Sequence, residues 1–375
     1  MKVFLFRSLI VFIVFDLFTI FGPMVFAQSK TMIAASKLFL YPKKSSVYSV
    51  AKFQYIRGKN KKRKTHLSKA LKSLMERSRQ KSYEILMLRQ EMKKAIDTLK
   101  KQSAILDLEG DTAVIGDVHG DYENLIKIID DIQPALESGE IKNVLFLGDY
   151  IDRGPSSFKT LLILLKFFNE NPGKVFLLRG NHETIDMYMG GGGKNLARNE
   201  KAFKSIGNDL LFAFFNQLPY AAVINDETLA VHGGVPHRNY WRDFWRNEKI
   251  SDVKTEHFAP IYSALWSDYD KKGDAKSSGS LRGKNPLLVC YNEGCVREFF
   301  EESSKLEYLL LNKICLKYLI RAHQSWLGDF HQTLNKIITT IFSAVKGQDF
   351  VELGRKARVA IVKKGMAPEL FVRSR

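Results

Sequence analysis

Five short apolar runs in this chain each end in a loop rich in aspartate, histidine, asparagine or arginine. Each run has the length and the apolar character of a buried strand. In chain order, the runs and the loops that follow them are 112–115 with Gly-Asp-Val-His-Gly, 144–147 with Gly-Asp-Tyr-Ile-Asp-Arg-Gly, 175–178 with Arg-Gly-Asn-His-Glu, 228–231 with His-Gly-Gly, and 318–320 with Arg-Ala-His-Gln. Because ligand sites in α/β proteins form at the carboxyl ends of the strands, the pattern predicts one site built from all five loops.

The first of these loops places Asp117 and His119 two residues apart, between glycines. Glycine lets the backbone turn sharply and leaves space beside it. A carboxylate together with an imidazole suits Mn, Fe or Zn better than Ca. A single Asp-x-His after a strand is also compatible with an ordinary capped loop, so the prediction of a metal site depends on the other four loops.

The positive charge of the chain is concentrated near its N-terminus. The net charge is +18, from 58 Lys and Arg against 40 Asp and Glu. Residues 28–104 contain 21 basic and four acidic residues, whereas residues 105–375 contain 35 of each. The basic region therefore indicates a contact with something anionic that is separate from the predicted site, and it carries no information about the substrate.

Residues 1–27 resemble a secretory signal. Lys2 and Arg7 are followed by a mostly apolar stretch that ends in the small residue Ala27, where a signal peptidase could cut. Asp16 within this stretch opposes membrane insertion. We therefore expect an exported protein, secreted or periplasmic. An uncleaved membrane anchor and an ordinary buried helix are the alternatives.

Residues 28–104 are expected to form a basic linker followed by a long helix. The run Lys-Asn-Lys-Lys-Arg-Lys at 59–64 suits either a solvated linker or a patch that binds phospholipid headgroups or nucleic acid. Apolar residues in 66–104 recur at alternating spacings of four and three, which predicts the helix. Because few of these heptads are regular, we expect the helix to pack on the rest of a monomer rather than to form a coiled-coil dimer.

From residue 105 to residue 375 the pattern alternates between strands, loops and helices, which predicts one α/β domain. The segments with helical spacing are 122–136, 158–168, 200–217 and 293–302. Strands beyond the five runs are expected at 221–224, 340–343, 357–362 and 370–372. Because strands dominate the second half of the domain, we expect that half to form a second sheet packed on the first.

The cysteines, Cys290, Cys295 and Cys315, lack the spacing of a zinc site. We expect them to be buried free thiols, with a Cys290–Cys295 disulfide as the alternative.

Taken in order, the five loops resemble the motif series of the phosphoprotein phosphatases, a family of calcineurin-like metallophosphoesterases. Four further stretches agree with that family: Phe-Asn-Gln-Leu-Pro at 215–219, Leu-Trp-Ser-Asp at 265–268, Arg-Gly at 282–283 and Phe-Ser-Ala at 342–344. The resemblance covers residues 107–372 and leaves out the N-terminal part. It implies an α/β (α+β) fold, a β-sandwich flanked by helices, which in this chain follows an N-terminal helical extension.

The resemblance also implies a site with two divalent metal ions, Mn²⁺ first and Fe or Zn as alternatives. The implied metal ligands are Asp117 and His119 for the first ion, Asp149 as a bridge, and Asn181, His232 and His323 for the second. The implied catalytic residues are His182 as the proton donor to the leaving group, Asp152 as its orienting partner, and Arg153 and Arg282 as phosphate clamps. A hydroxide between the two metals would attack phosphorus directly.

The expected activity is hydrolysis of phosphoserine and phosphothreonine in proteins. One departure from the family affects substrate choice. After Phe-Ser-Ala, the family's eukaryotic protein phosphatases usually continue with Pro-Asn-Tyr, and that tyrosine faces the active site. This chain has Val345, Lys346 and Gly347 instead, and a run of four glycines at 190–193 marks a second divergent segment. We therefore expect a more open site, which accepts phosphotyrosine as well and resists natural-product toxins.

Two other functions share parts of this pattern. A dinucleoside polyphosphate hydrolase would use the same metal ligands. A phosphate-binding adaptor without enzymatic activity would dock through the basic N-terminal arm, although the complete ligand set argues against it. Glu183 is predicted to orient His232 or a nearby backbone segment.

Overall fold

The structure, a computed structural model, describes residues 61–190, 196–246, 258–275, 289–346 and 358–371. The chain divides into two compact units, Met1–Leu74 and Met75–Arg375. The predicted signal or anchor at 1–27 lies outside the described residues. Among the helices that are described, none has both the length and the apolar character needed to cross a membrane.

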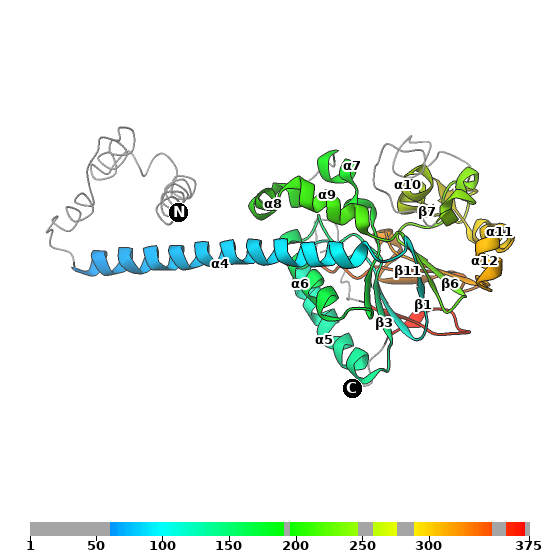
Figure 1. Ribbon diagram of the computed structural model, residues 1–375, viewed down its shortest axis with the longest axis horizontal. Helices are drawn as coiled ribbons and strands as arrows, with labels where there is room; N and C mark the ends of the chain where they lie inside the picture. Colours follow the sequence, from blue (N-terminus) through cyan, green and yellow to red (C-terminus); the bar gives the residue numbers. More distant parts are fainter. Residues whose placement is uncertain (1–60, 191–195, 247–257, 276–288, 347–357, 372–375) are drawn as a thin grey trace. The chain divides into compact units, whose positions relative to one another are not determined.

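Two β-sheets form the centre of the second unit (Figure 1). In spatial order, the six-stranded sheet consists of β1 (Ile105–Leu108), β5 (Ala221–Ile224), β6 (Thr228–Val231), β9 (Tyr318–Arg321), β11 (Ile338–Ile341) and β10 (Phe330–Gln332). The five-stranded sheet consists of β13 (Glu369–Leu370), β12 (Ala360–Val362), β2 (Thr112–Ile115), β3 (Asn143–Phe146) and β4 (Val175–Leu177). β2, β3 and β4 run parallel, as do β6 and β9, so the loops at their carboxyl ends lie at one edge of each sheet.

The two sheets pack face to face because successive residues of a strand point to opposite sides. Val114 and Leu145 of the five-stranded sheet share a buried cluster with Ile320 and Ile341 of the six-stranded sheet. Phe146, the next residue after Leu145, belongs instead to a cluster shared with helices. Each strand therefore contributes side chains to the layer between the sheets and to an outer layer under the helices.

Helices cover the outer face of each sheet. The cluster on the five-stranded sheet includes side chains from α5 (Tyr122–Ser138), α6 (Ser157–Glu170), α8 (Lys201–Ile206) and α9 (Asn208–Gln217). The cluster on the six-stranded sheet includes side chains from α10 (Phe258–Trp266), α11 (Glu293–Ser304) and α12 (Glu307–Leu311). The domain also contains α7 (Ile185–Gly190) and the strand pair β7 (Asp268–Tyr269) and β8 (Cys290–Tyr291). The predicted β-sandwich flanked by helices is thus confirmed.

The long N-terminal helix is α4, Lys61–Leu99. It ends five residues before the predicted end because β1 begins at Ile105, and the carbonyl of Ala104 just before it accepts a hydrogen bond from the backbone amide of Tyr220. Leu88, Met92 and Leu99 are fully buried in the cluster that underlies α5 and α6. The C-terminal part of α4 therefore packs on the five-stranded sheet's helices, as its apolar spacing predicts.

Three expectations about the elements need correction. The segment 200–217 is two helices, α8 and α9, because Gly207 between them has a φ of 89°. The strand expected at 340–343 is β11, two residues earlier. The second sheet is not formed by the second half of the domain alone, since β1 joins β5 in one sheet and β12 pairs with β2 in the other.

All three cysteines lie in the described part of the chain, and none of them forms a disulfide. Cys290 and Cys295 are buried, as expected, whereas Cys315 is exposed. The alternative of a Cys290–Cys295 disulfide is therefore wrong.

Candidate metal centre

The loops after five strands meet in one buried group of polar side chains. Backbone hydrogen bonds join them in pairs. The His119 amide donates to the Asp149 carbonyl at 2.8 Å, and the Ala322 amide donates to the His232 carbonyl at 2.9 Å. The backbone amide of His323 donates to the Asp117 carboxylate at 2.9 Å, which connects the two sheets. The six predicted metal ligands are all buried and lie in these loops.

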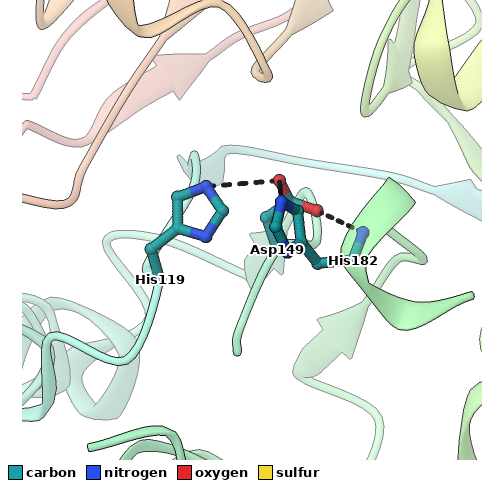
Figure 2. A group of neighbouring side chains, drawn as sticks. All are labelled: His119, Asp149 and His182. Carbon is teal, nitrogen blue, oxygen red and sulfur yellow. Dashed lines mark hydrogen bonds and ion pairs between the residues drawn. The ribbon is translucent and has the colours of Figure 1, made fainter. Parts of the chain in front are cut away.

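A first cluster of ligand atoms contains Asp117, His119 and Asp149. His119 Nε2 lies 3.4 Å from Asp117 Oδ2 and 3.3 Å from Asp149 Oδ2. The other ring nitrogen of His119, Nδ1, lies 3.0 Å from the carbonyl oxygen of Ile151. If Nδ1 donates its proton to that carbonyl, Nε2 of the neutral ring directs a lone pair at the two carboxylates. Figure 2 shows the Asp149 carboxylate between the ring of His119 and the residue on its other side, His182.

A second cluster contains Asn181, His232 and His323. His232 Nε2 lies 2.9 Å from Asn181 Oδ1 and 3.1 Å from His323 Nδ1, which in turn lies 2.9 Å from the same Asn181 oxygen. His232 Nδ1 is held by the carbonyl of Leu147 at 2.9 Å. Asp149 reaches this cluster with its other oxygen, since Oδ1 lies 3.4 Å from His232 Nε2. One carboxylate thus faces both clusters, one oxygen to each.

The chemistry of these atoms fits two metal cations. Carboxylate oxygens, an amide oxygen and imidazole lone pairs are acceptors, and acceptors brought this close together need positive charge between them. Asp117 Oδ2 is buried and has no hydrogen-bond partner among the described residues. Ligand atoms of Asp149, His232 and His323 lie within 4.8 Å of one another, as do those of His119, Asp149 and His182. The two clusters therefore suit a dinuclear site in which Asp149 bridges the metals.

The backbone around the site is held in unusual conformations. His119, Asp149 and His323 have positive φ values of 44°, 55° and 72°, a backbone conformation that residues other than glycine rarely adopt. The loops also approach closely, because a Cβ on Gly148 would lie 2.2 Å from the backbone nitrogen of Gly180. The glycines that precede Asp149 and Asn181 are thus required by the contact between two loops.

His182 stands beside the first cluster and is held by Asp152. His182 Nδ1 lies 2.7 Å from Asp152 Oδ2, and the other Asp152 oxygen accepts the amide of Ala197 at 2.6 Å. His182 Nε2 is 4.0 Å from Asp149 Oδ2. Arg153 is half-buried, and its positive charge contributes to lowering the pKa of His182. Arg282, the second predicted phosphate clamp, lies outside the described residues.

Burial and neighbouring charges together lower the pKa values of Asp149 and His182. Burial alone would raise the pKa of Asp149, but the neighbouring His232 and His182 hold that pKa well below its ordinary value. Burial lowers the pKa of His182, an effect that Asp149 and the hydrogen bond to Asp152 partly offset. Asp149 is therefore ionised and able to bridge cations at neutral pH.

A family model described as calcineurin-like phosphoesterase matches residues 111–325, a segment that contains all six predicted metal ligands. The chain belongs to the calcineurin-like phosphoesterase family. It is accordingly a metal-dependent phosphoester hydrolase by family, as the loop motifs predict.

Solved structures of three other proteins are similar to this chain to different degrees. A protein serine/threonine phosphatase from Saccharomyces cerevisiae, with similarity to human phosphatase PP5, aligns with a TM-score of 0.55 at 21% identity over 79% of this chain and 90% of that one. A cold-active protein-tyrosine phosphatase of a psychrophilic Shewanella aligns with a TM-score of 0.42 at 16% identity, over 74% of this chain and 84% of that one. A putative diadenosine tetraphosphatase aligns with a TM-score of 0.38 at 13% identity, over 72% of this chain and 99% of that one.

Two acidic residues of this phosphoesterase support the site without belonging to the predicted ligands. The carboxylate of Glu183 accepts the backbone amides of Asp149 at 2.8 Å and Gly180 at 3.1 Å, so it fixes backbone as expected. Burial and the charge of Asp149 raise the pKa of Glu183 to about 8. Asp268, the last residue of the Leu-Trp-Ser-Asp stretch, places Oδ1 3.7 Å from His323 Nε2. The sequence motif alone does not predict this contact with a metal ligand.

Proposed function

We propose that this protein is a phosphoprotein phosphatase that uses two metal ions to hydrolyse phosphomonoesters of serine and threonine, and also of tyrosine. The observation that supports the proposal most directly is the placement of His182. Its ring stands next to the bridging carboxylate of Asp149 and is fixed by Asp152 at 2.7 Å. A proton donor beside a dinuclear site suits a reaction whose leaving group is an alkoxide.

Each step of the proposed reaction has a residue to perform it. The two clusters would hold two divalent cations, which when bound would supply positive charge for the phosphate oxygens and would make water a stronger acid. Arg153 and Arg282 hold the non-bridging oxygens of the phosphate through their planar guanidinium groups. His182 gives the proton on Nε2 to the leaving oxygen as the P–O bond breaks, while Asp152 holds Nδ1. Water supplies the oxygen of the new P–O bond, and the proton that it releases replaces the one given up by His182, so the products are an alcohol and inorganic phosphate.

The substrate range follows from the segment after Phe-Ser-Ala. The amides of Val345 and Lys346 both donate to the Asp121 carboxylate, at 2.9 and 2.6 Å. Val345 and Lys346, the first two residues after Phe-Ser-Ala, are thus held at the start of α5. This arrangement supports an open site that accepts the larger phosphotyrosine. Strong inhibition by cyclic-peptide toxins, together with no turnover of phosphotyrosine peptides, would contradict this part of the proposal.

The experiment that tests the function is a substrate panel with purified protein that begins at Gln28. Metal content is measured first, and Mn²⁺, Fe²⁺ and Zn²⁺ are then compared as activators. The substrates are phosphoserine, phosphothreonine and phosphotyrosine peptides alongside diadenosine tetraphosphate. Preference for the peptides supports the phosphatase, and preference for the dinucleotide supports the polyphosphate hydrolase. Failure to hydrolyse any substrate with Mn²⁺ added would leave the phosphate-binding adaptor.

We also propose that the protein is exported and that its basic region, residues 28–104, binds an anionic membrane surface. On α4, the exposed side chains of Tyr83 and Leu86, 58% and 53% accessible, lie near the exposed basic residues Arg79 and Lys93. Apolar and basic side chains together suit a phospholipid interface. Sedimentation with vesicles that contain phosphatidylserine, but not with phosphatidylcholine vesicles, is the expected result. Binding to nucleic acid at physiological salt without vesicle binding would contradict the proposal.

A further inference from the structure

The loop that carries Asp117 and His119 runs beside a segment more than 220 residues later in the chain. Asp117 forms an isolated parallel β-bridge with Phe342, the residue that follows β11. The backbone amide of Gly116 donates to Ser343 Oγ at 3.0 Å. The rings of His119 and Phe342 have centroids 6.1 Å apart. Phe342 and Ser343 thus lie against the loop that carries two ligands of the first cluster.

Asp121 joins these two segments at their far end. Its side chain is buried, with 1% of the residue exposed, and it lies two residues after His119. Oδ2 accepts the backbone amides of Val345 at 2.9 Å and Lys346 at 2.6 Å. The same carboxylate accepts the amide and the side chain of Asn124 and so caps α5.

A carboxylate is well suited to this position. Its two oxygens accept hydrogen bonds and donate none, so it can satisfy several N–H groups that point at one spot. Its charge also lies at the positive end of α5. An uncharged amide of the same size would place its NH₂ group against some of these N–H donors. An alanine would leave the amides of Val345 and Lys346 without this acceptor.

We propose that Asp121 is a positioning residue for the first metal. By fastening 345–346 to the loop that carries Asp117 and His119, it keeps that loop in the conformation that presents both side chains to one ion. The second cluster, Asn181, His232 and His323, has no direct bond to Asp121 among the described residues. The proposal rests on the metal-binding part of the proposed function and is independent of the substrate.

The test compares metal binding by the full-length protein and by Asp121→Ala. Removal of a supporting interaction around a metal ligand typically weakens metal affinity by about 10–100-fold. We expect that loss for one of two Mn²⁺ equivalents in equilibrium dialysis, while the other equivalent keeps its parental affinity. Electron paramagnetic resonance should change from the signal of a coupled Mn²⁺ pair to that of single ions. Asp121→Asn should fall between Asp121→Ala and the parent.

A matched control is Glu123→Gln. Glu123 forms an exposed ion pair with Lys346, so this variant removes a side-chain contact to the same segment but keeps the buried hydrogen bonds. We expect its Mn²⁺ binding to stay within about twofold of the parent, as for other exposed ion pairs.

A second variant keeps the test informative if Asp121→Ala does not fold. Ser343→Ala removes the hydroxyl that accepts the Gly116 amide and donates to the Arg358 carbonyl at 2.7 Å. It should weaken the same single Mn²⁺ equivalent. A folded variant of either kind that binds two Mn²⁺ as the parent does, or that loses both equally, would overturn the proposal. A parent that binds two Mn²⁺ yet hydrolyses no phosphopeptide would contradict the proposed function and leave the role of Asp121 intact.

Discussion

The two ligand clusters of this phosphoesterase are built in different ways. Asp117, His119 and Asp149 come from loops after β2 and β3, which are adjacent parallel strands of one sheet. Asn181 follows β4 of that sheet, but His232 and His323 follow β6 and β9 of the other sheet. The ligands of the first cluster therefore all come from one sheet, although the Asp117 loop is also bonded to His323 and Phe342, which follow strands of the other sheet. The ligands of the second cluster come from both sheets, so their spacing depends directly on how the sheets pack.

Asp149 contributes one oxygen to each cluster, so its replacement should have the largest effect on metal binding and hydrolysis. Asp149→Asn replaces the bridging carboxylate by an amide, which is a weaker ligand with one oxygen. We expect the variant to lose both metal ions on dialysis and phosphoester hydrolysis to fall to the buffer background. Metal analysis and release of inorganic phosphate measure the two effects. Asp97→Asn, at an exposed position on α4, is the control. If Asp149→Asn kept one ion at full occupancy, the two clusters would be independent of each other.

His182 tests whether chemistry can be separated from both clusters. His182→Asn should lower kcat for phosphoserine peptides by about 10²–10⁴-fold, the usual contribution of a general acid. The metal content should stay at the parental value. The loss should be much smaller with p-nitrophenyl phosphate, because nitrophenolate leaves without protonation. An equal loss for both substrates would show that His182 does not act as the acid.

The packing between the sheets should affect the second cluster selectively. Ile320→Ala removes a fully buried side chain from the layer between the sheets, on the strand that leads to His323. Ile132→Ala removes an equally buried isoleucine from α5, on the outer face of the five-stranded sheet. Each should lower the free energy of unfolding by about 2–5 kcal/mol. Only Ile320→Ala should also weaken the binding of one metal equivalent. Urea unfolding measures the change in stability, and equilibrium dialysis measures the change in metal affinity. Equal metal binding by the two variants would show that packing between the sheets does not position the second cluster.

The smallest effect is expected at the contact between α4 and α6, which touches neither cluster. Glu91 is buried, with 5% of the residue exposed, and it pairs with Lys94 at 2.9 Å and accepts Asn169 Nδ2 at 2.8 Å. Burial opposes ionisation, but these two partners hold the pKa of Glu91 below its ordinary value. Its stabilisation is therefore complete above the ordinary glutamate pKa and is lost as the pH falls through the lower pKa of the folded state.

Glu91→Gln should consequently cost about 0.5–1.5 kcal/mol of unfolding free energy at neutral pH. The difference from the parent should shrink as the medium becomes acidic, and both proteins should bind two metal ions. Urea unfolding across the acidic range measures it. A difference that grows with acidity would mean that the carboxylate is destabilising in the folded state.

Local signals predicted much of this fold. The run 112–115 coincides with β2, and 228–231 coincides with β6, since a threonine and three apolar residues before a glycine or a polar loop are a strong strand pattern. The apolar spacing of α4 correctly indicated that Leu88, Met92 and Leu99 pack on the domain. The apolar spacing does not predict the break at Gly207, because the spacing continues across it. The break comes from the backbone φ of 89° at this glycine, which leaves no mark in the apolar pattern.

By itself, the sequence determined which residue types would form the site, their order in the chain and their place after buried strands, because these depend on neighbours within a few residues. Tertiary structure alone decided that Asp149 turns one oxygen to each cluster and that Asp121 binds the amides of Val345 and Lys346. Those contacts join segments far apart in the chain. Their geometry is set by the pairing of strands and the packing of two sheets, which no local pattern of residues records.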